Sequence, residues 1–211
     1  MKFPLLNIDG KNSESIEVSD KIFKIKVNYK LIKSVIDWQL NHSKPRTAKT
    51  KQRNKIQGST KKIIAQKGSG GARHASKKAP IFVGGGIAHG PKGNVYKIKK
   101  INKKVRKLAL AQTLSKKYSD KNLFLLSDVK KEIKKTKEFN NFLIKNNLKN
   151  VLIISDTESL KNINKSARNI KNLKLIKEEG ANIYDLFNYK NVVITSTSVK
   201  KLQERILNEK N

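Results

Sequence analysis

Acidic residues are absent from the middle of this chain. Residues 38–119 run for 82 positions without one Asp or Glu, although they hold 22 of the 48 Lys and Arg residues. A segment of this composition has no internal counter-charge, so its cations repel one another unless a polyanion neutralises them. Because the formal net charge of the whole chain is +32, we predict a nucleic acid as the partner, with an anionic membrane surface as a distant second.

Cysteine is also missing, and so is any long apolar run. The first absence excludes disulfides and thiolate metal sites. The histidines, His42, His74 and His89, lack zinc-finger spacing and have no acid nearby, so we predict neither a metal nor another cofactor. Since no run of about 18 apolar residues occurs and the N-terminus is too soon polar for a signal peptide, we expect a cytoplasmic protein without a membrane partner.

The flanking segments have the patterns of a folded α/β body. Apolar alternation predicts strands within residues 1–27, including a half-buried strand over 22–27. Asn28 is expected to cap a helix that ends near Asn41, and Asn102 to cap the next helix. Beyond residue 119, buried-type strands alternate with amphipathic helices. These strands are expected at residues 123–126, 151–154, 173–176 and 192–195.

Helix starts can also be placed in the C-terminal half. Thr136 is the expected cap of one helix, Ser155 with Glu158 has the form of a capping box, and Thr197 or Ser198 should start the last helix. Continuous apolar strands separated by amphipathic helices are typical of a parallel sheet. The sequence therefore predicts an α/β fold with a mostly parallel sheet and helices on both faces. We expect a single domain over 1–211, formed by residues 1–41 and 102–211, with a long extended basic loop at 42–101.

An α/β body raises the question of catalysis. The phosphate-loop pattern is absent, and the glycines at 68–71 neither follow a clear strand nor open a helix, as a dinucleotide site requires. Asp128 and Asp156 follow strands, where open α/β sheets carry catalytic carboxylates, but capping of the next turn or helix is the favoured interpretation. With no nucleophile–His–acid arrangement in view, we predict that the protein is not an enzyme.

The basic loop has no helical or strand period. Its cations alternate with Gly, Gln and Asn, which suits contacts with irregular, folded RNA, whereas the usual DNA-binding motifs are absent. A general nucleic-acid binder of the nucleoid type is the alternative. Because the loop buries little apolar surface, we expect it to be disordered in the free protein and to become ordered when it binds RNA. The predicted RNA contacts are Lys44, Arg46, Lys49, Lys51, Arg53, Lys55, Lys61, Lys62, Lys67, Arg73, His74, Lys77, Lys78, Lys92, Lys97, Lys99, Lys100, Lys103, Lys104 and Arg106.

The loop and the residues after it carry a specific series of motifs. These are Lys61-Lys62, Gln66-Lys67-Gly68-Ser69-Gly70, Ala72-Arg73, Pro80-Ile81, Gly84-Gly85-Gly86-Ile87 and Val105-Arg106-Lys107-Leu108. In order and spacing they resemble the family of the universal fourth protein of the large ribosomal subunit, in its bacterial form. The helix around Val35–Gln39 and the α/β C-terminal half resemble the family too, so the resemblance covers essentially the whole chain.

The resemblance implies a structural constituent of the large ribosomal subunit that supports subunit assembly and translation on cytoplasmic ribosomes. Its partners would be large-subunit ribosomal RNA and neighbouring large-subunit ribosomal proteins. The loop would thread the RNA, and its tip, near the nascent peptide, would line a constriction of the exit tunnel. The implied tunnel-tip residues are Ile63, Ile64, Ala65, Gln66, Lys67, Gly68, Ser69, Gly70 and Gly71.

The tip departs from the family's usual pattern at three places. Residues 63–65 are Ile-Ile-Ala where relatives commonly have Pro, an aromatic residue and Arg. Gly71 stands where many have Arg, and Phe82 where the aromatic residue is usually Trp. The tip therefore has fewer cations and one fewer large stacking ring than the resemblance implies for relatives.

Overall fold

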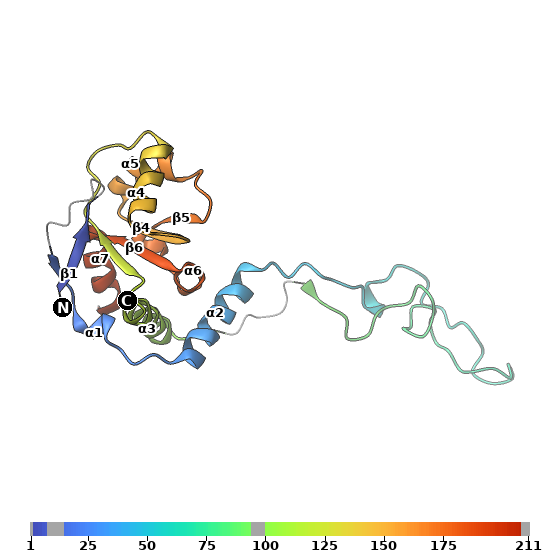
Figure 1. Cartoon of the computed structure of the whole chain (residues 1–211). Helices are drawn as coiled ribbons and strands as arrows, with labels where there is room; N and C mark the ends of the chain where they lie inside the picture. The colour runs from blue at the N-terminus through green and yellow to red at the C-terminus, as the bar shows by residue number, and fades with distance from the viewer. Residues whose placement is uncertain (1, 8–14, 94–99, 208–211) are drawn as a thin grey trace. The chain divides into compact units, whose positions relative to one another are not determined.

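The structure, a computed structural model, describes residues 2–7, 15–93 and 100–207 (Figure 1). The chain divides into two compact units. The body comprises residues 1–39 and 100–211, and the loop unit comprises residues 40–99. Among the described residues, no helix combines the length and the apolar character needed to cross a lipid bilayer.

A sheet of six strands forms the centre of the body. The strands are β1 (Lys2–Leu6), β2 (Ser15–Glu17), β3 (Leu123–Leu126), β4 (Val151–Ser155), β5 (Leu173–Lys177) and β6 (Asn191–Thr195). They lie in the order β2-β1-β3-β6-β4-β5, and only the β1–β2 pair is antiparallel. This arrangement confirms the predicted α/β fold with a mostly parallel sheet.

Seven α-helices lie within the described residues. They are α1 (Asp20–Phe23), α2 (Tyr29–Ser43), α3 (Lys103–Ser119), α4 (Thr136–Lys145), α5 (Thr157–Ala167), α6 (Ile183–Asn188) and α7 (Ser196–Leu207). Two 3₁₀ turns, η1 (Arg53–Lys55) and η3 (Glu178–Gly180), accompany them.

Two hydrophobic clusters show how the helices cover the sheet. Because side chains alternate along a strand, Leu152 and Ile154 of β4 face one way, and Ile153 faces the other. The first face packs against α1, α3, α6 and α7, and the second against α4 and α5 (Figure 1). All five residues of β4 are buried, which explains their continuous apolar sequence.

The predicted strand over residues 22–27 is wrong. Ile22 and Phe23 are adjacent and both buried, whereas a half-buried strand would bury only one of them, and they end the short helix α1 instead. The backbone then pairs with a side chain rather than with a neighbouring strand. The Ser115 hydroxyl donates to the carbonyl of Ile22 at 2.6 Å and accepts from the N–H of Ile25 at 3.1 Å.

Helix starts were predicted with mixed success. Asn28 caps α2, because its Oδ1 accepts from the N–H groups of Lys30 and Leu31. Thr136 is the first residue of α4 rather than its cap, and α7 begins at Ser196. The expected capping box is wrong, because Asp156 caps α5 while Ser155 ends β4 as a buried residue. Asn102 occupies the N-cap position of α3 without a capping hydrogen bond from its side chain.

Replacing Ser115 tests the anchor between α1 and α3. We expect Ser115→Ala to lower the free energy of unfolding by about 1–3 kcal/mol, because a buried carbonyl and a part-buried N–H lose their partner. Ser119→Ala, one turn later on the same helix, removes a hydroxyl at an exposed position that donates only to a carbonyl of its own helix, that of Ser115 at 3.0 Å, and should change the free energy of unfolding by less than about 0.5 kcal/mol. Urea unfolding followed by circular dichroism measures both. Equal effects of the two substitutions would show that the Ser115 bonds contribute little.

Candidate nucleic-acid interface

The loop unit contains two chain segments that run side by side. Lys49 and Lys92 form an antiparallel bridge. The N–H of Thr50 donates to the carbonyl of Pro91 at 2.9 Å, and that of Ile87 to the carbonyl of Lys51 at 2.9 Å. The N–H of Gly93 also donates to the carbonyl of Ala48 at 2.8 Å. Residues 48–51 and 87–93 are therefore paired arms, although the unit has little regular secondary structure.

Glycine allows the arms to cross at close range. A Cβ atom on Gly86 would collide with the backbone N and Cα of Arg53, and one on Gly90 would collide with the hydroxyl of Thr50. Both glycines are buried. Any other residue would push the arms apart, because only glycine permits so close a backbone approach.

The tip of the loop unit is a small closed turn. The guanidinium Nε of Arg73 donates to the carbonyl of Gln66 at 3.3 Å, and the Lys62 ammonium donates to the side-chain oxygen of Gln66. Gly68 and Gly70 have positive φ angles of 85° and 63°, a conformation that favours glycine. The implied tunnel-tip residues are all exposed except Ile64, which is half-buried.

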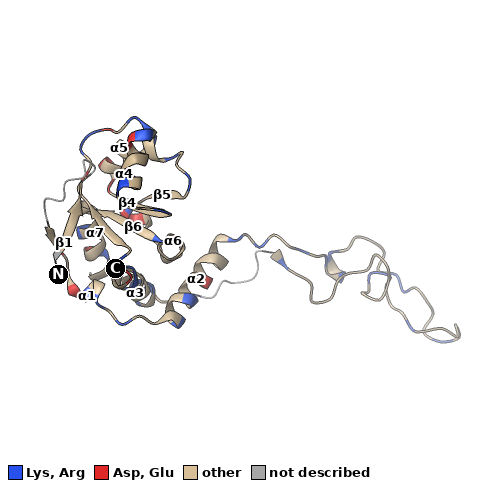
Figure 2. Cartoon of the chain, viewed as in Figure 1, with Lys and Arg blue, Asp and Glu red and all other residues tan. Residues whose placement is uncertain are grey.

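The cations of the loop unit have no carboxylate side chain in their own unit, since residues 40–99 contain neither Asp nor Glu. Figure 2 shows Lys and Arg along this unit without any acidic side chain. Lys78 is half-buried, and Lys97 and Lys99 lie outside the described residues. The other predicted cations of the unit are exposed: Lys44, Arg46, Lys49, Lys51, Arg53, Lys55, Lys61, Lys62, Lys67, Arg73, Lys77 and Lys92.

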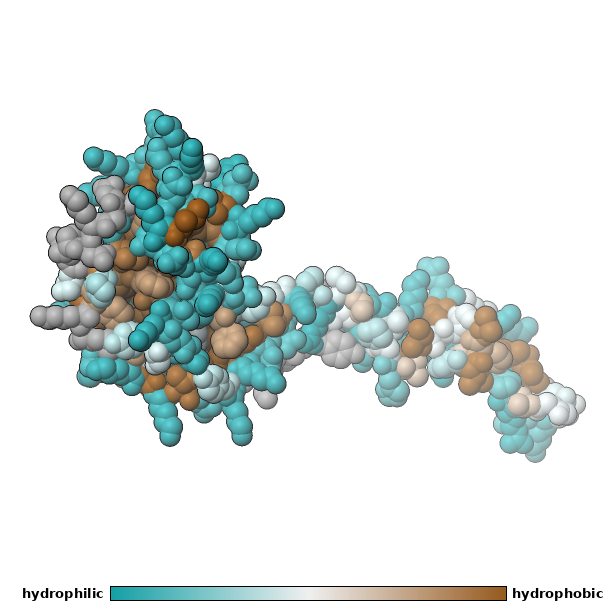
Figure 3. Space-filling view, viewed as in Figure 1, coloured by the Kyte–Doolittle hydropathy of each residue, from teal (hydrophilic) through white to brown (hydrophobic). Residues whose placement is uncertain are grey.

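Rings and aliphatic side chains lie among these cations. The rings of His74 and Phe82 meet edge to face at 4.9 Å, so the predicted contact residue His74 is half-buried against Phe82. Ile81, Val83 and Ile87 are exposed, and Figure 3 shows apolar patches on the loop unit. The unit therefore offers both positive charge and apolar surface to a partner.

The remaining predicted contacts belong to the body. Lys100, Lys103 and Lys104 are exposed, and the last two begin α3 together with Arg106. The first turn of α3 has no acidic residue, so its cations oppose the helix dipole unless an anion is present. The guanidinium carbon of Arg106 lies 4.9 Å from the ring centroid of Trp38 on α2. No local pattern in the sequence signals the pairing of Trp38 with a residue so far along the chain.

Asp128 and Asp156 act as helix caps. Asp128 accepts from the hydroxyls of Ser196 and Thr197, each at 2.6 Å, and from the N–H of Thr197 at 3.1 Å. One oxygen of Asp156 accepts from the N–H groups at 158 and 159, at 3.2 and 3.3 Å. This confirms the capping interpretation. The two carboxylates therefore occupy the N-termini of α7 and α5, which are the positions where a nucleotide phosphate would bind.

The pKa of Asp156 gives a test of its role as a cap. Burial of its carboxyl group raises the pKa, but hydrogen bonds from Ser159 and from the N–H of Glu158 outweigh burial, so the pKa lies below its ordinary value. A lowered pKa adds stability that is present above the pKa of the unfolded chain, about 3.9, and that is lost as pH falls through the folded value.

We therefore expect Asp156→Ala to reduce the free energy of unfolding by about 1 kcal/mol near neutral pH, and by progressively less below about pH 4. Glu158→Ala is the matched control, because Glu158 is an exposed carboxylate in the same turn of α5 and makes no capping bond through its side chain. Urea titrations at several pH values measure both differences. A loss that does not shrink in acid contradicts the assignment.

Comparison with known proteins agrees with this arrangement. A family model described as the ribosomal protein L4/L1 family matches residues 16–205. A protein of Pelagibacter ubique is 50% identical over 206 residues, which cover 97% of this chain and 99% of the relative. Proteins of Hyphomonas neptunium and Geotalea uraniireducens are 37% and 36% identical, and the matches cover 97% and 96% of this chain and 96% and 97% of those relatives. All three are named large ribosomal subunit protein uL4. These matches confirm the resemblance seen in the motifs: the chain belongs to the ribosomal protein L4/L1 family.

Proposed function

We propose that this protein is a structural, non-enzymatic constituent of the large ribosomal subunit and binds large-subunit ribosomal RNA. The observation that carries the proposal is the loop unit, whose exposed cations have no acidic residue among them. The names of the three relatives support the same assignment. Neighbouring ribosomal proteins are the other expected partners.

Two features of the loop unit favour RNA binding: its positive charge and the close crossing of its two arms. Lys and Arg side chains neutralise phosphates and release condensed counterions, which drives association with RNA. The closely crossed arms leave the cations pointing outward, so RNA can surround them on several sides. In this proposal residues 1–41 and 102–211 fold as one domain, and residues 42–101 thread the RNA and become ordered there.

The tip is proposed to lie beside the nascent peptide in the exit tunnel. The family resemblance supports this placement, and the tip has a suitable form. Its glycines Gly68 and Gly70 have open space where a side chain would begin, so the backbone itself can pass close to a neighbour. Gly71 and the Ile63–Ala65 segment give this tip an unusually uncharged surface on either side of Lys67.

Sedimentation and salt titration test the proposed function. We expect the protein to remain with large subunits through a moderate-salt wash of a cell lysate. If about eight cations engage phosphates, affinity for large-subunit RNA should fall by roughly three to five orders of magnitude from about 50 to about 200 mM salt. Free protein in the soluble fraction, or a flat salt response, contradicts the proposal. Equal affinity for duplex DNA at matched salt would favour a nucleoid-type binder.

The crossing at Gly86 offers a test that leaves the net charge unchanged. We expect Gly86→Ala to weaken binding to large-subunit RNA by about tenfold or more, which is about 1.4 kcal/mol, because the added methyl group separates the arms. Gly71→Ala is the control, since the nearest atom to its new Cβ would be a carbonyl oxygen at 3.9 Å and its φ is not positive. Filter binding measures both affinities. Similar losses in the two variants would mean that the crossing is not needed for binding.

A further inference from the structure

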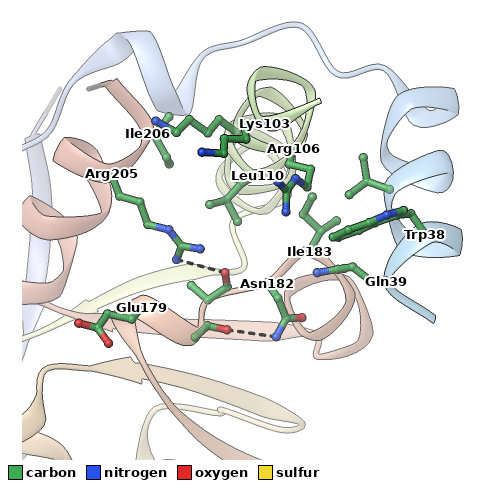
Figure 4. Close-up of a pocket in the computed structure, with 14 residues that line it drawn as sticks. Trp38, Gln39, Lys103, Arg106, Leu110, Glu179, Asn182, Ile183, Arg205 and Ile206 are labelled. Atoms are coloured by element: carbon green, nitrogen blue, oxygen red, sulfur yellow. Dashed lines mark hydrogen bonds between the residues drawn. The ribbon is translucent and has the colours of Figure 1, made fainter. Parts of the chain in front are cut away.

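A cavity of about 350 Å³ opens in the body between α2, α3, α7 and the turn that follows β5 (Figure 4). Its walls are partly apolar, with Val35, Leu110 and Ile183 among them. Four cations also line it, and Glu179 is the single acid among its lining residues. The cations are Lys103, Arg106, Lys107 and Arg205. A pocket of this size with apolar walls and a few polar groups is typical of a small-ligand site.

Arg106 enters this cavity from α3 (Figure 4). Its guanidinium lies over the indole of Trp38 at 4.9 Å, an arrangement that fixes a planar cation beside an aromatic ring. The Nε atom of Arg106 is buried and has no hydrogen-bond partner among the described residues. Buried donors are usually paired, so this N–H points to an acceptor that a ligand would supply.

Gln39 provides a second donor. Its side-chain oxygen accepts from the backbone N–H of Tyr184 at 3.1 Å. The amide nitrogen, on the other side of the same group, is the donor. Figure 4 shows that this nitrogen is directed toward the cavity. The bond to Tyr184 ties α2 to α6 and holds the amide in place.

The floor of the cavity is also fixed before any ligand arrives. Arg205 donates to the carbonyls of Glu178 and Ala181, at 3.0 and 3.4 Å. The amide of Asn182 donates to the carbonyl of Gly180 at 3.2 Å and to Asp185 at 2.8 Å. Because these bonds hold the turn after β5, binding need not order it, which favours affinity.

We propose that this cavity binds one unstacked nucleotide of the ribosomal RNA. The base would lie among the apolar walls beside Trp38, with its acceptor atoms toward Gln39 and Arg106. The phosphate would lie near Lys103 and Lys107 at the start of α3, whose dipole favours an anion. Recognition of RNA commonly uses bases that are splayed out and stacked on aromatic or Arg side chains. The inference rests on the proposed function and specifies one site within it.

Trp38 makes the site directly observable, because it is the one Trp in the chain. We expect large-subunit RNA to change the emission of Trp38, as a base enters beside its ring. Fully paired duplex RNA should bind through charge and leave the emission nearly unchanged. Free nucleoside monophosphates, at the same nucleotide concentration, should also leave it unchanged. An equal change with the duplex, or a full change with the monophosphates, overturns the proposal of an RNA nucleotide.

Substitution of Gln39 tests the donor. Gln39→Glu keeps an oxygen for the N–H of Tyr184 but removes the amide donor. Lys33→Gln, at an exposed position of the same helix outside the cavity, lowers the net charge by the same amount. We expect Gln39→Glu to bind large-subunit RNA about tenfold more weakly than Lys33→Gln, and the two to bind paired duplex RNA equally. Thermal unfolding of both variants checks that the body remains folded.

The outcomes separate the cavity from the wider function. If the unsubstituted protein shows no salt-dependent binding to large-subunit RNA, the proposed function itself fails. If it binds, but Gln39→Glu and Lys33→Gln have the same affinity for that RNA, the cavity does not hold a nucleotide and only this inference fails.

Discussion

The cations of the loop unit must find their counter-charge outside that unit, and much of the structure depends on this constraint. No carboxylate side chain occurs in residues 40–99, so unfavourable repulsion remains until an anion is bound. Exposed Lys side chains gain little from the protein itself. Within the unit, backbone hydrogen bonds such as that from Thr50 to Pro91 hold parts of its path, but they do not offset the charge of its cations.

The body shows the opposite arrangement. All the acidic residues of the chain lie in the body, and some pair with nearby cations, as in the contacts of Lys174 with Asp185 at 2.7 Å and of Lys201 with Glu178 at 2.8 Å. Exposed ion pairs, such as that of Lys24 with Asp20 at 3.0 Å, contribute little to stability. The stability of the body comes instead from the two hydrophobic clusters on either side of the sheet. The hydrophobic clusters lie in the body, so the loop unit can accumulate charge without weakening the core.

The sequence was informative wherever one periodic signal dominated. Buried strands such as β4 and β6 are predicted almost to the residue, because their central residues are all apolar and both faces of the sheet are covered. The segment that contains the end of α1 is misread because Phe23, Ile25 and Val27 alternate with Lys24 and Lys26 over so few residues. What decides its structure is the hydroxyl of Ser115, and no local pattern shows that bond.

The candidate sites divide in the same way. Charge and composition are enough to predict RNA binding by the loop, since these properties do not depend on three-dimensional arrangement. The cavity beside Trp38 could not be predicted, because its walls come from four separated segments. Helix caps can be predicted in part from the sequence. A carboxylate at the end of a strand suggests a cap, but only the geometry shows that Asp156, and not Ser155, performs it.

The paired arms of the loop unit also have a topological consequence. Since residues 48–51 run beside residues 87–93, the two arms would enter the RNA side by side in the proposed complex. The loop would then be inserted as a doubled segment, and no chain end would have to pass through the RNA. The association can then form and be undone without cutting either molecule, and no knot or link is created between them.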